Sequence, residues 1–262
     1  MSKELVHVLW TGGWDSSYRV VQLSMREVII QPVYVEDAGR KSVPYELQAM
    51  KSIVSMLEKK TETQAEFLPV KIIKVEDIPA NPEITEAYLL FKKEADMGSQ
   101  HDWLARLSMQ YPGIELCIEK ALGDHAPVRQ SINRHGKLID TGDGYIVDKE
   151  NSSKELNLVI GNIKLPIFDK TEVEMQKDIH TWGYDDVMSH IWFCHRPING
   201  KPCGLCSPCS TKMTSNMASL LPVAAQKRNI RMRSIEKKFG RKASSFYKKV
   251  ARKLAKQERK RD

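Results

Sequence analysis

The stretch LVHVLWTGGWDSS, residues 5–17, decides the fold of this chain of 262 residues. Leu5 to Trp10 is a short apolar run that predicts a buried strand, and the two glycines after it predict a tight turn. Asp15 to Met25 follows without a helix breaker and predicts a helix. A buried strand that turns directly into a helix is typical of α/β proteins, so we expect that class of fold.

Three further segments continue this alternation of strand and helix. Apolar runs at 29–35 and 70–75 predict two more strands, and Pro44 opens a second helix with apolar residues at helical spacing. Strands separated by helices of this length imply parallel pairing. The first hundred residues therefore indicate a doubly wound, mostly parallel sheet.

The middle of the chain is less regular. We expect two helices, a hairpin and a strand here, at 84–95, 101–109, 138–147 and 156–160 respectively. Thr171 and Glu174 form a capping-box pattern, which predicts that another helix begins there. Cys117 falls in an apolar stretch, where we expect a helix and a buried, unreactive thiol.

The charge of the chain is divided between two dissimilar parts. The formal net charge is +8, but residues 222–262 carry 16 Lys and Arg against three acidic residues, a net charge of +13. The remaining 221 residues have a net charge of −5. We therefore expect a mildly acidic body, residues 1–221, and a basic tail, residues 222–262. No apolar run approaches the roughly 18 residues of a membrane-spanning helix, and the start lacks a signal peptide, so we expect a cytoplasmic protein.

Apolar residues recur at helical spacing in the tail and predict two amphipathic basic helices hinged near Gly240. A segment of this charge would bind phosphate polymers in a salt-sensitive way. Its partner could be tRNA, DNA, an acidic protein or a membrane surface. Alternatively, the tail is a solvated end whose apolar stripe packs on the body.

The turn at residues 11–17 has the composition of an anion site. Its glycines let the backbone come close to a ligand, and the following helix offers N–H groups at its N-terminus. Thr11, Ser16 and Ser17 add hydroxyl donors for phosphate oxygens. The turn is neither a Walker loop nor a Gly-x-Gly-x-x-Gly motif. The alternative is a tight strand-to-helix turn in which Asp15 caps the helix.

Four of the five cysteines follow the pattern Cys194-x8-Cys203-x2-Cys206-x2-Cys209. Thiolates at this spacing, on turns that contain glycine and proline, can converge on one ion, and four sulfur ligands close a structural zinc site. Without a secretory signal a disulfide framework is disfavoured, and a redox Cys-x-x-Cys pair would not account for four cysteines. An iron–sulfur cluster uses the same donors and stays an alternative.

The order of these motifs resembles a known enzyme family. Residues 11–16 resemble the Ser-Gly-Gly-x-Asp-Ser loop of the ATP pyrophosphatase (PP-loop) superfamily, with Thr11 in place of the first serine. The Cys-Gly-Leu-Cys run of the cysteine pattern and Lys170 in the segment 166–172 extend the likeness to the 7-cyano-7-deazaguanine synthase family. The resemblance covers roughly residues 5–215. Residues 98–101 replace the family's usual Arg-Asn pair, and 123–162 have no clear counterpart.

The resemblance implies an ATP-dependent carbon–nitrogen ligase with ATP, Mg²⁺ and Zn²⁺ as cofactors. In the family reaction a 7-deazaguanine carboxylate attacks the α-phosphorus of ATP, and ammonia captures the acyl-adenylate as an amide, which a second activation converts to a nitrile. The residues implied for ATP are Thr11, Gly12, Gly13, Asp15, Ser16 and Ser17, with Asp15 as a Mg²⁺ ligand or a helix cap. Lys170 would face the α-phosphate; otherwise it is a solvated surface lysine.

The resemblance says less about the substrate. Gln100, His101 and Glu115 lie where the family recognises the base, and amide and carboxylate groups suit a guanine-like edge; otherwise each is an ordinary helix or surface residue. We also expect a homodimer. One alternative function is a relative in a defence or surface-polysaccharide pathway that adenylates another carboxylate or modifies a protein or nucleic acid. Another is an inactive nucleic-acid-binding scaffold, against which the intact glycine turn argues.

Overall fold

The structure is a computed structural model that describes residues 3–120, 127–215 and 217–258. Within these residues the chain divides into two compact units. The first unit comprises residues 1–38 and 50–191, and the second comprises residues 39–49 and 192–262. The helix α2 (Val43–Leu57) contributes to both units. None of the described helices is both long enough and apolar enough to cross a membrane.

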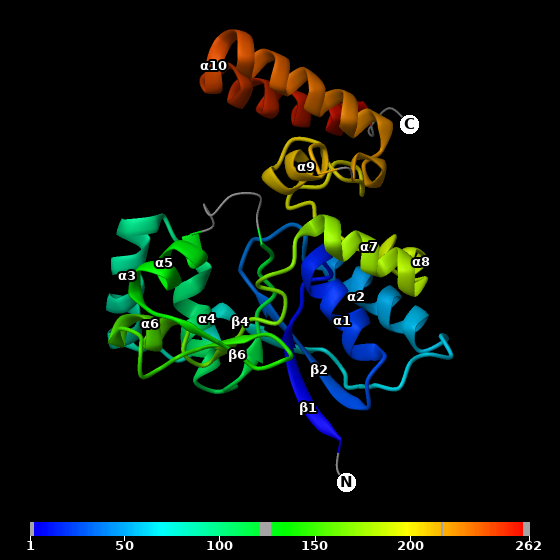
Figure 1. Cartoon of the computed structure of the whole chain (residues 1–262). Helices are drawn as coiled ribbons and strands as arrows, with labels where there is room; N and C mark the ends of the chain where they lie inside the picture. Colours follow the sequence, from blue (N-terminus) through cyan, green and yellow to red (C-terminus); the bar gives the residue numbers. More distant parts are fainter. Residues whose placement is uncertain (1–2, 121–126, 216, 259–262) are drawn as a thin grey trace. The chain divides into compact units, whose positions relative to one another are not determined.

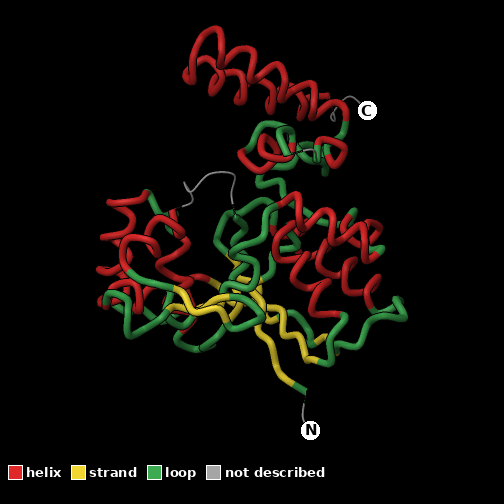
Figure 2. Tube along the Cα trace, viewed as in Figure 1, coloured by secondary structure: helices red, strands yellow, loops and turns green. Residues whose placement is uncertain are grey.

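A parallel sheet forms the centre of the first unit (Figure 2). Its strands are β1 (Glu4–Leu9), β2 (Val28–Glu36), β3 (Glu66–Phe67), β4 (Lys71–Lys74), β5 (Ile114–Glu115) and β8 (Ile163–Lys164). The strand order is β3-β2-β1-β5-β8, β4 also pairs with β2, and all these pairings are parallel. The order reverses between β1 and β5, and open α/β sheets bind ligands at the carboxyl ends of the strands at such a point.

Helices cover both faces of this sheet (Figure 1). One group consists of α1 (Trp14–Ser24), α7 (Glu172–Trp182) and α8 (Asp185–Met188), which contact one another. The other consists of α3 (Pro82–Ala95), α4 (Gln100–Ser108), α5 (Pro127–His135) and α6 (Lys154–Val159). A short helical turn, η1 (Val75–Asp77), follows β4. This arrangement is consistent with the doubly wound fold predicted from the sequence.

Local signals in the sequence explain several element boundaries. Asn81 caps α3 by accepting a hydrogen bond from the Ile84 N–H at 3.2 Å, and the next residue is proline, which suits the first turn of a helix. The predicted capping box before α7 is present, with Thr171 and Glu174 bonded in both directions. The predicted hairpin is also present, as β6 (Leu138–Asp140) paired with β7 (Tyr145–Val147).

Two sequence predictions are wrong. Residues 156–160 are not a strand, because Ser153 caps a helix there by accepting a hydrogen bond from the Leu156 N–H at 3.1 Å. A short apolar run fits a buried helix as well as a strand, and the strand of this region, β8, comes three residues later. Cys117 does not lie in a helix, since it follows the short strand β5 in an irregular segment.

The second unit is built around the cysteine pattern and the basic tail. It contains α9 (Ser207–Lys212), η2 (Ala218–Leu220) and α10 (Val223–Glu258). Gly240, with φ 80° and ψ 177°, interrupts α10, and the two arms run side by side as a helical hairpin (Figure 1). Met232 of one arm and Ala251 of the other join the cysteines in one apolar core. The predicted hinge is confirmed; residues 259–262 of the predicted tail lie outside the described residues.

Candidate ligand site and metal centre

The glycine turn joins β1 to α1 where the strand order of the sheet reverses. Gly12 has a φ of 68°, a left-handed conformation that favours glycine. Gly13, not Asp15, is the N-cap of α1. Glycine has no side chain to cap the helix, so the N-cap residue supplies no side-chain acceptor for the first N–H groups of α1. The first N–H groups of a helix lack acceptors within the helix, and the helix dipole attracts negative charge there. The turn is therefore suited to holding an anion.

The hydroxyl groups of the turn differ in their surroundings. Ser17 is fully buried, and its Oγ accepts a hydrogen bond from Nε1 of Trp10 at 2.9 Å. This bond ties α1 to the end of β1 and gives Ser17 a packing role. Thr11 and Asp15 are half-buried, and Ser16 is 9% exposed. These three side chains lie at the helix start, where a bound anion would be.

A polar cavity of about 220 Å³ lies along the flank of α1. Its walls come from α1, from the turn between β6 and β7, and from the segment that follows β8. Tyr18 and Arg19 line it from α1, Asp143 from the hairpin turn, and Asp169 and Lys170 from the third segment. The structure thus brings Lys170, predicted from the sequence, to a cavity that shares α1 with the glycine turn.

Lys170 is held in place by a carboxylate on the next helix. Its Nζ lies 2.8 Å from Oδ2 of Asp178, which also accepts a hydrogen bond from the Tyr18 hydroxyl at 2.6 Å. Burial raises the pKa of Asp178, but these two hydrogen bonds outweigh burial and keep the pKa below its ordinary value. The carboxylate therefore stays charged and holds the ammonium group of Lys170, whose side chain is 38% exposed, at the cavity wall.

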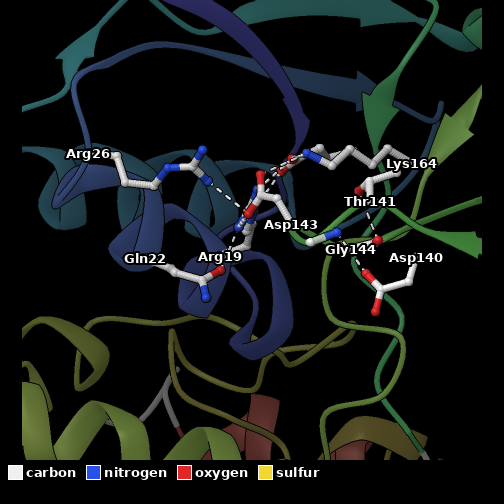
Figure 3. A network of polar contacts seen from close by, with 10 residues as sticks. Arg19, Gln22, Arg26, Asp140, Thr141, Asp143, Gly144 and Lys164 are labelled. Carbon is white, nitrogen blue, oxygen red and sulfur yellow. Dashed lines mark hydrogen bonds and ion pairs between the residues drawn. The ribbon is translucent and has the colours of Figure 1, made fainter.

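An ion network, shown in Figure 3, contributes Arg19 and Asp143 to the wall of the cavity. Arg19 donates to both carboxylate oxygens of Glu115, at 2.8 and 2.7 Å, and to both of Asp143, at 3.0 and 2.9 Å. Lys164 contacts Asp143 at 2.9 Å and Glu115 at 3.1 Å, and Arg26 contacts Asp143 at 2.8 Å. Arg19 is 1% exposed and Glu115 is fully buried, so water screens this pair little.

The network favours the charged forms of Asp143 and Arg19. Burial raises the pKa of Asp143, but hydrogen bonds from Arg19, Arg26 and Lys164 outweigh burial and lower the pKa far below its ordinary range. Burial likewise lowers the pKa of Arg19, and its bonds to the two carboxylates more than reverse that effect. Four cationic and anionic side chains from α1, β5, β8 and the hairpin turn are thereby locked together.

The hairpin turn that carries Asp143 is rigidly attached to the sheet. Tyr145 and Leu165 exchange backbone hydrogen bonds of 3.0 and 2.8 Å. Gly144 has a φ of 116°, and a Cβ at this position would lie 2.5 Å from Cα of Pro166. A side chain cannot be accommodated there, so the close approach requires glycine. The turn is therefore a fixed wall of the cavity.

The residues predicted to recognise a base lie on two different elements, α4 and β5. Glu115 is fully buried, and Arg19 occupies both of its oxygens. Gln100 and His101 begin α4, and none of the described contacts joins either of them to Glu115. His101 is buried, its Nδ1 has no hydrogen-bond partner, and burial lowers its pKa to about 4. Sequence reasoning named Glu115 but missed its partners Arg19 and Asp143, because no local pattern pairs positions so distant in sequence.

The buried His101 predicts a loss of stability in mild acid. Its pKa is 6.5 when unperturbed and about 4 in the folded chain, so the folded state binds fewer protons between these values. The contribution of neutral His101 to the free energy of unfolding is complete above pH 6.5 and shrinks as the pH falls toward 4. The total loss of stability is about 3 kcal/mol. Urea unfolding between pH 7.5 and 4.5 should therefore show a smaller pH slope for His101→Gln. The exposed His180→Gln should keep the wild-type slope; equal slopes in all three proteins would contradict the prediction.

The four cysteines of the second unit form a compact sulfur cluster. Their Sγ atoms all lie within 4.8 Å of one another, with Cys203 and Cys209 4.0 Å apart and Cys206 and Cys194 3.9 Å apart. The edge of a tetrahedron with Zn–S bonds of about 2.3 Å is about 3.8 Å, close to these values. The cluster could therefore hold a metal ion such as zinc.

Backbone groups around the cluster favour thiolates. The Cys203 N–H points at Sγ of Cys194, and the Leu205 N–H points at Sγ of Cys203, both at 3.2 Å. Without a metal ion the four thiols share their protons unequally: hydrogen bonding among them lowers the pKa of Cys203 and Cys206 and raises the pKa of Cys194 and Cys209. Three of the cysteines are fully buried and Cys206 is partly exposed. This donor set fits a closed structural metal site rather than a reactive redox pair.

The first arm of α10 is attached directly to the cysteine cluster. Arg228 donates to the Cys203 carbonyl at 2.9 Å, and the fully buried Asn229 donates to the Gly204 carbonyl at 2.8 Å. Gly204 has a φ of 73°, and a Cβ there would lie 2.0 Å from the Ala225 carbonyl oxygen. The tail is thus part of the same folded unit as the cysteines.

Comparisons with models of protein families and with curated proteins found no match. The likeness stated from the motifs therefore stays a prediction. Three features of the molecule bear on its function: the glycine turn, the polar cavity and the cysteine cluster.

Proposed function

We propose that this chain is an ATP-dependent carbon–nitrogen ligase that adenylates a carboxylate. The observation that carries the proposal is the glycine turn at the reversal point of the sheet, next to a polar cavity on the same helix. A turn of this kind suits a polyphosphate, and the cavity suits a small polar acceptor beside it. The sequence resemblance points to 7-carboxy-7-deazaguanine as the carboxylate, with an amide or nitrile as product.

Each part of the site has a role in this reaction. Gly12, Gly13 and the N-terminus of α1 would bind the phosphates, with the hydroxyls of Thr11 and Ser16 as further donors. The half-buried carboxylate of Asp15, in the first turn of α1, fits a Mg²⁺ ligand, and the ion would neutralise phosphate charge. Lys170, positioned by Asp178, would stabilise the negative charge that develops during adenylation.

The cysteine cluster has a structural role in this proposal, with zinc as its metal. The four cysteines would supply all the ligands of a tetrahedral ion, so no position would be left for water or substrate. The ion would fix the turns around Cys203 and Gly204, on which the first arm of α10 rests.

Incubation with ATP, Mg²⁺, 7-carboxy-7-deazaguanine and ammonia tests the proposal. Mass spectrometry should detect the amide or the nitrile, and AMP should accumulate in step with it. Omission of ammonia should leave the product absent. Failure to form either product with zinc-loaded protein would contradict the assignment of this substrate.

The exchange Lys170→Met should reduce the turnover of ATP by about 100-fold or more, the usual effect of removing one stabilising group from a developing anion. Its pair with Asp178 is partly exposed, so stability should change by less than about 1 kcal/mol. Lys177→Met removes an exposed lysine of α7 and should leave turnover unchanged. Equal turnover of both variants and wild type would show that Lys170 has no part in the reaction.

A second candidate is a related ligase that adenylates a different carboxylate or modifies a protein or nucleic acid. The observation behind it is the hairpin turn with Asp143, which lines the cavity and belongs to the region without a counterpart in the family. A panel of carboxylic acids, each scored by AMP formation, distinguishes the two candidates.

A further inference from the structure

The outer face of the helical hairpin α10 exposes large apolar side chains. Phe239, at the hinge, is 72% exposed, and Phe246 is 70% exposed. Val250 and Leu254 continue from Phe246 at intervals of four residues and are also exposed. Residues four apart lie on one side of a helix, so the second arm carries an apolar stripe, Phe246, Val250 and Leu254.

The stripe is not part of the core of its unit. The side chains of the second arm that face inward are Ser244 and Ala251, which are buried, and Tyr247, which packs against the cysteine core. At about 100° per residue, the stripe flanks this inward face of the arm and stays exposed. Exposed apolar residues that recur in register mark interaction surfaces rather than folding requirements.

Lysines are interleaved with the stripe. Lys242, Lys249 and Lys253 are exposed, and helical spacing places them beside Phe246, Val250 and Leu254. Two arginines of the first arm, Arg228 and Arg233, instead donate hydrogen bonds to backbone carbonyls near the cysteines. The stripe and these three lysines together form what we call the lysine–phenylalanine face.

We propose that the lysine–phenylalanine face binds the surface of an anionic lipid membrane, with the second arm of α10 lying in the plane of the interface. Phenyl and aliphatic groups enter the boundary between head groups and acyl chains, while the flexible lysine side chains reach lipid phosphates and carboxylates. Each basic residue near such a surface strengthens binding roughly fivefold. This inference does not depend on the proposed ligase activity.

Other occupants fit the face less well. A nucleic acid would satisfy the lysines through its phosphates but would leave Val250 and Leu254 in water, because aliphatic side chains do not stack on bases. A second copy of the same face would place lysines against lysines within a segment of net charge +13. Unlike a nucleic acid or a second copy, an anionic lipid surface takes up both the charge and the apolar stripe.

Co-sedimentation of the full chain with vesicles tests the proposal. Vesicles of phosphatidylcholine with about a third phosphatidylserine should bind the chain at least tenfold more strongly than phosphatidylcholine alone, because the three lysines act together. The double variant F246S/L254S should lose at least tenfold in vesicle binding, while its binding to a single-stranded RNA of 30 nucleotides should stay within twofold.

Matched controls lie on α3, where Leu89, Leu90, Lys92 and Lys93 are also exposed. The variants L89S/L90S and K92Q/K93Q should bind vesicles like the wild type, whereas K242Q/K249Q/K253Q should bind neither vesicles nor RNA at wild-type strength. Thermal unfolding checks that each variant is folded. The proposal is overturned if the wild type does not bind vesicles that contain phosphatidylserine. It is also overturned if F246S/L254S binds these vesicles as strongly as the wild type, or if that variant loses RNA binding rather than vesicle binding.

Discussion

Replacement of Cys203 by serine is expected to abolish metal binding and to unfold the second unit. Cys203 is fully buried, its Sγ lies 4.0 Å from that of Cys209, and its carbonyl anchors α10 through Arg228. A structural zinc ion contributes about 10–16 kcal/mol to the folding of a small unit, so loss of one of four ligands costs a large part of that stability. Metal analysis should find zinc in the wild type and almost none in the variant, and protease should cleave α10 rapidly.

Cys117→Ser is the matched control, because that thiol lies outside the cluster. Burial raises the pKa of Cys117 well above its ordinary value, which leaves it a poor metal ligand. The control should therefore keep its zinc and its resistance to protease. Retention of a full equivalent of zinc by Cys203→Ser would contradict the four-cysteine site. If the wild type contains iron instead of zinc, the four cysteines hold an iron–sulfur cluster.

Replacement of Arg19 by methionine should destabilise the first unit by about 3–5 kcal/mol. The reason is that the fully buried Glu115 would lose both hydrogen bonds from Arg19 and keep only the contact with Lys164. An uncompensated buried charge is far more costly than the loss of an exposed ion pair. Urea unfolding, followed by tryptophan fluorescence at neutral pH, measures the change.

The double variant R19M/E115L supplies the control. It removes both members of the pair, and an apolar replacement of a buried ion pair is often close to neutral. We therefore expect it to recover most of the stability lost in Arg19→Met, as a double-mutant cycle would show. If the single and double variants lose equal stability, the loss comes from altered packing rather than from the unpaired carboxylate of Glu115.

The glycine turn with its flanking strand and helix, and the cysteine cluster, could be predicted from local sequence patterns. The apolar run before Gly12 and Gly13 indicated β1, the turn and α1, and the spacing of the cysteines indicated a four-sulfur cluster. Both depend on residues close together in the chain. The helix at 154–159 was missed because its apolar run is too short to show a period, and only the cap at Ser153 distinguishes it.

The ion network could not be predicted in the same way. Arg19 and Glu115 are 96 positions apart, and Arg19 and Asp143 are 124 positions apart. Their pairing follows from the strand order and from the rigid hairpin turn, neither of which a local pattern contains. The tail shows the same limit: its hinge at Gly240 was predictable, but the exposure of Phe239 and Phe246 depends on how the hairpin packs on the cysteine unit.

The most direct test of the proposed ligase activity is to identify which phosphate bond of ATP is broken. Phosphorus NMR of a reaction with ATP, Mg²⁺, ammonia and 7-carboxy-7-deazaguanine resolves AMP and pyrophosphate from ADP and phosphate. We predict AMP and pyrophosphate in equal amounts, dependent on the acid and lost in a Gly12→Val variant, whose side chain disfavours the left-handed turn. Formation of ADP and phosphate, or no consumption of ATP with any acid tested, would contradict the proposed adenylation.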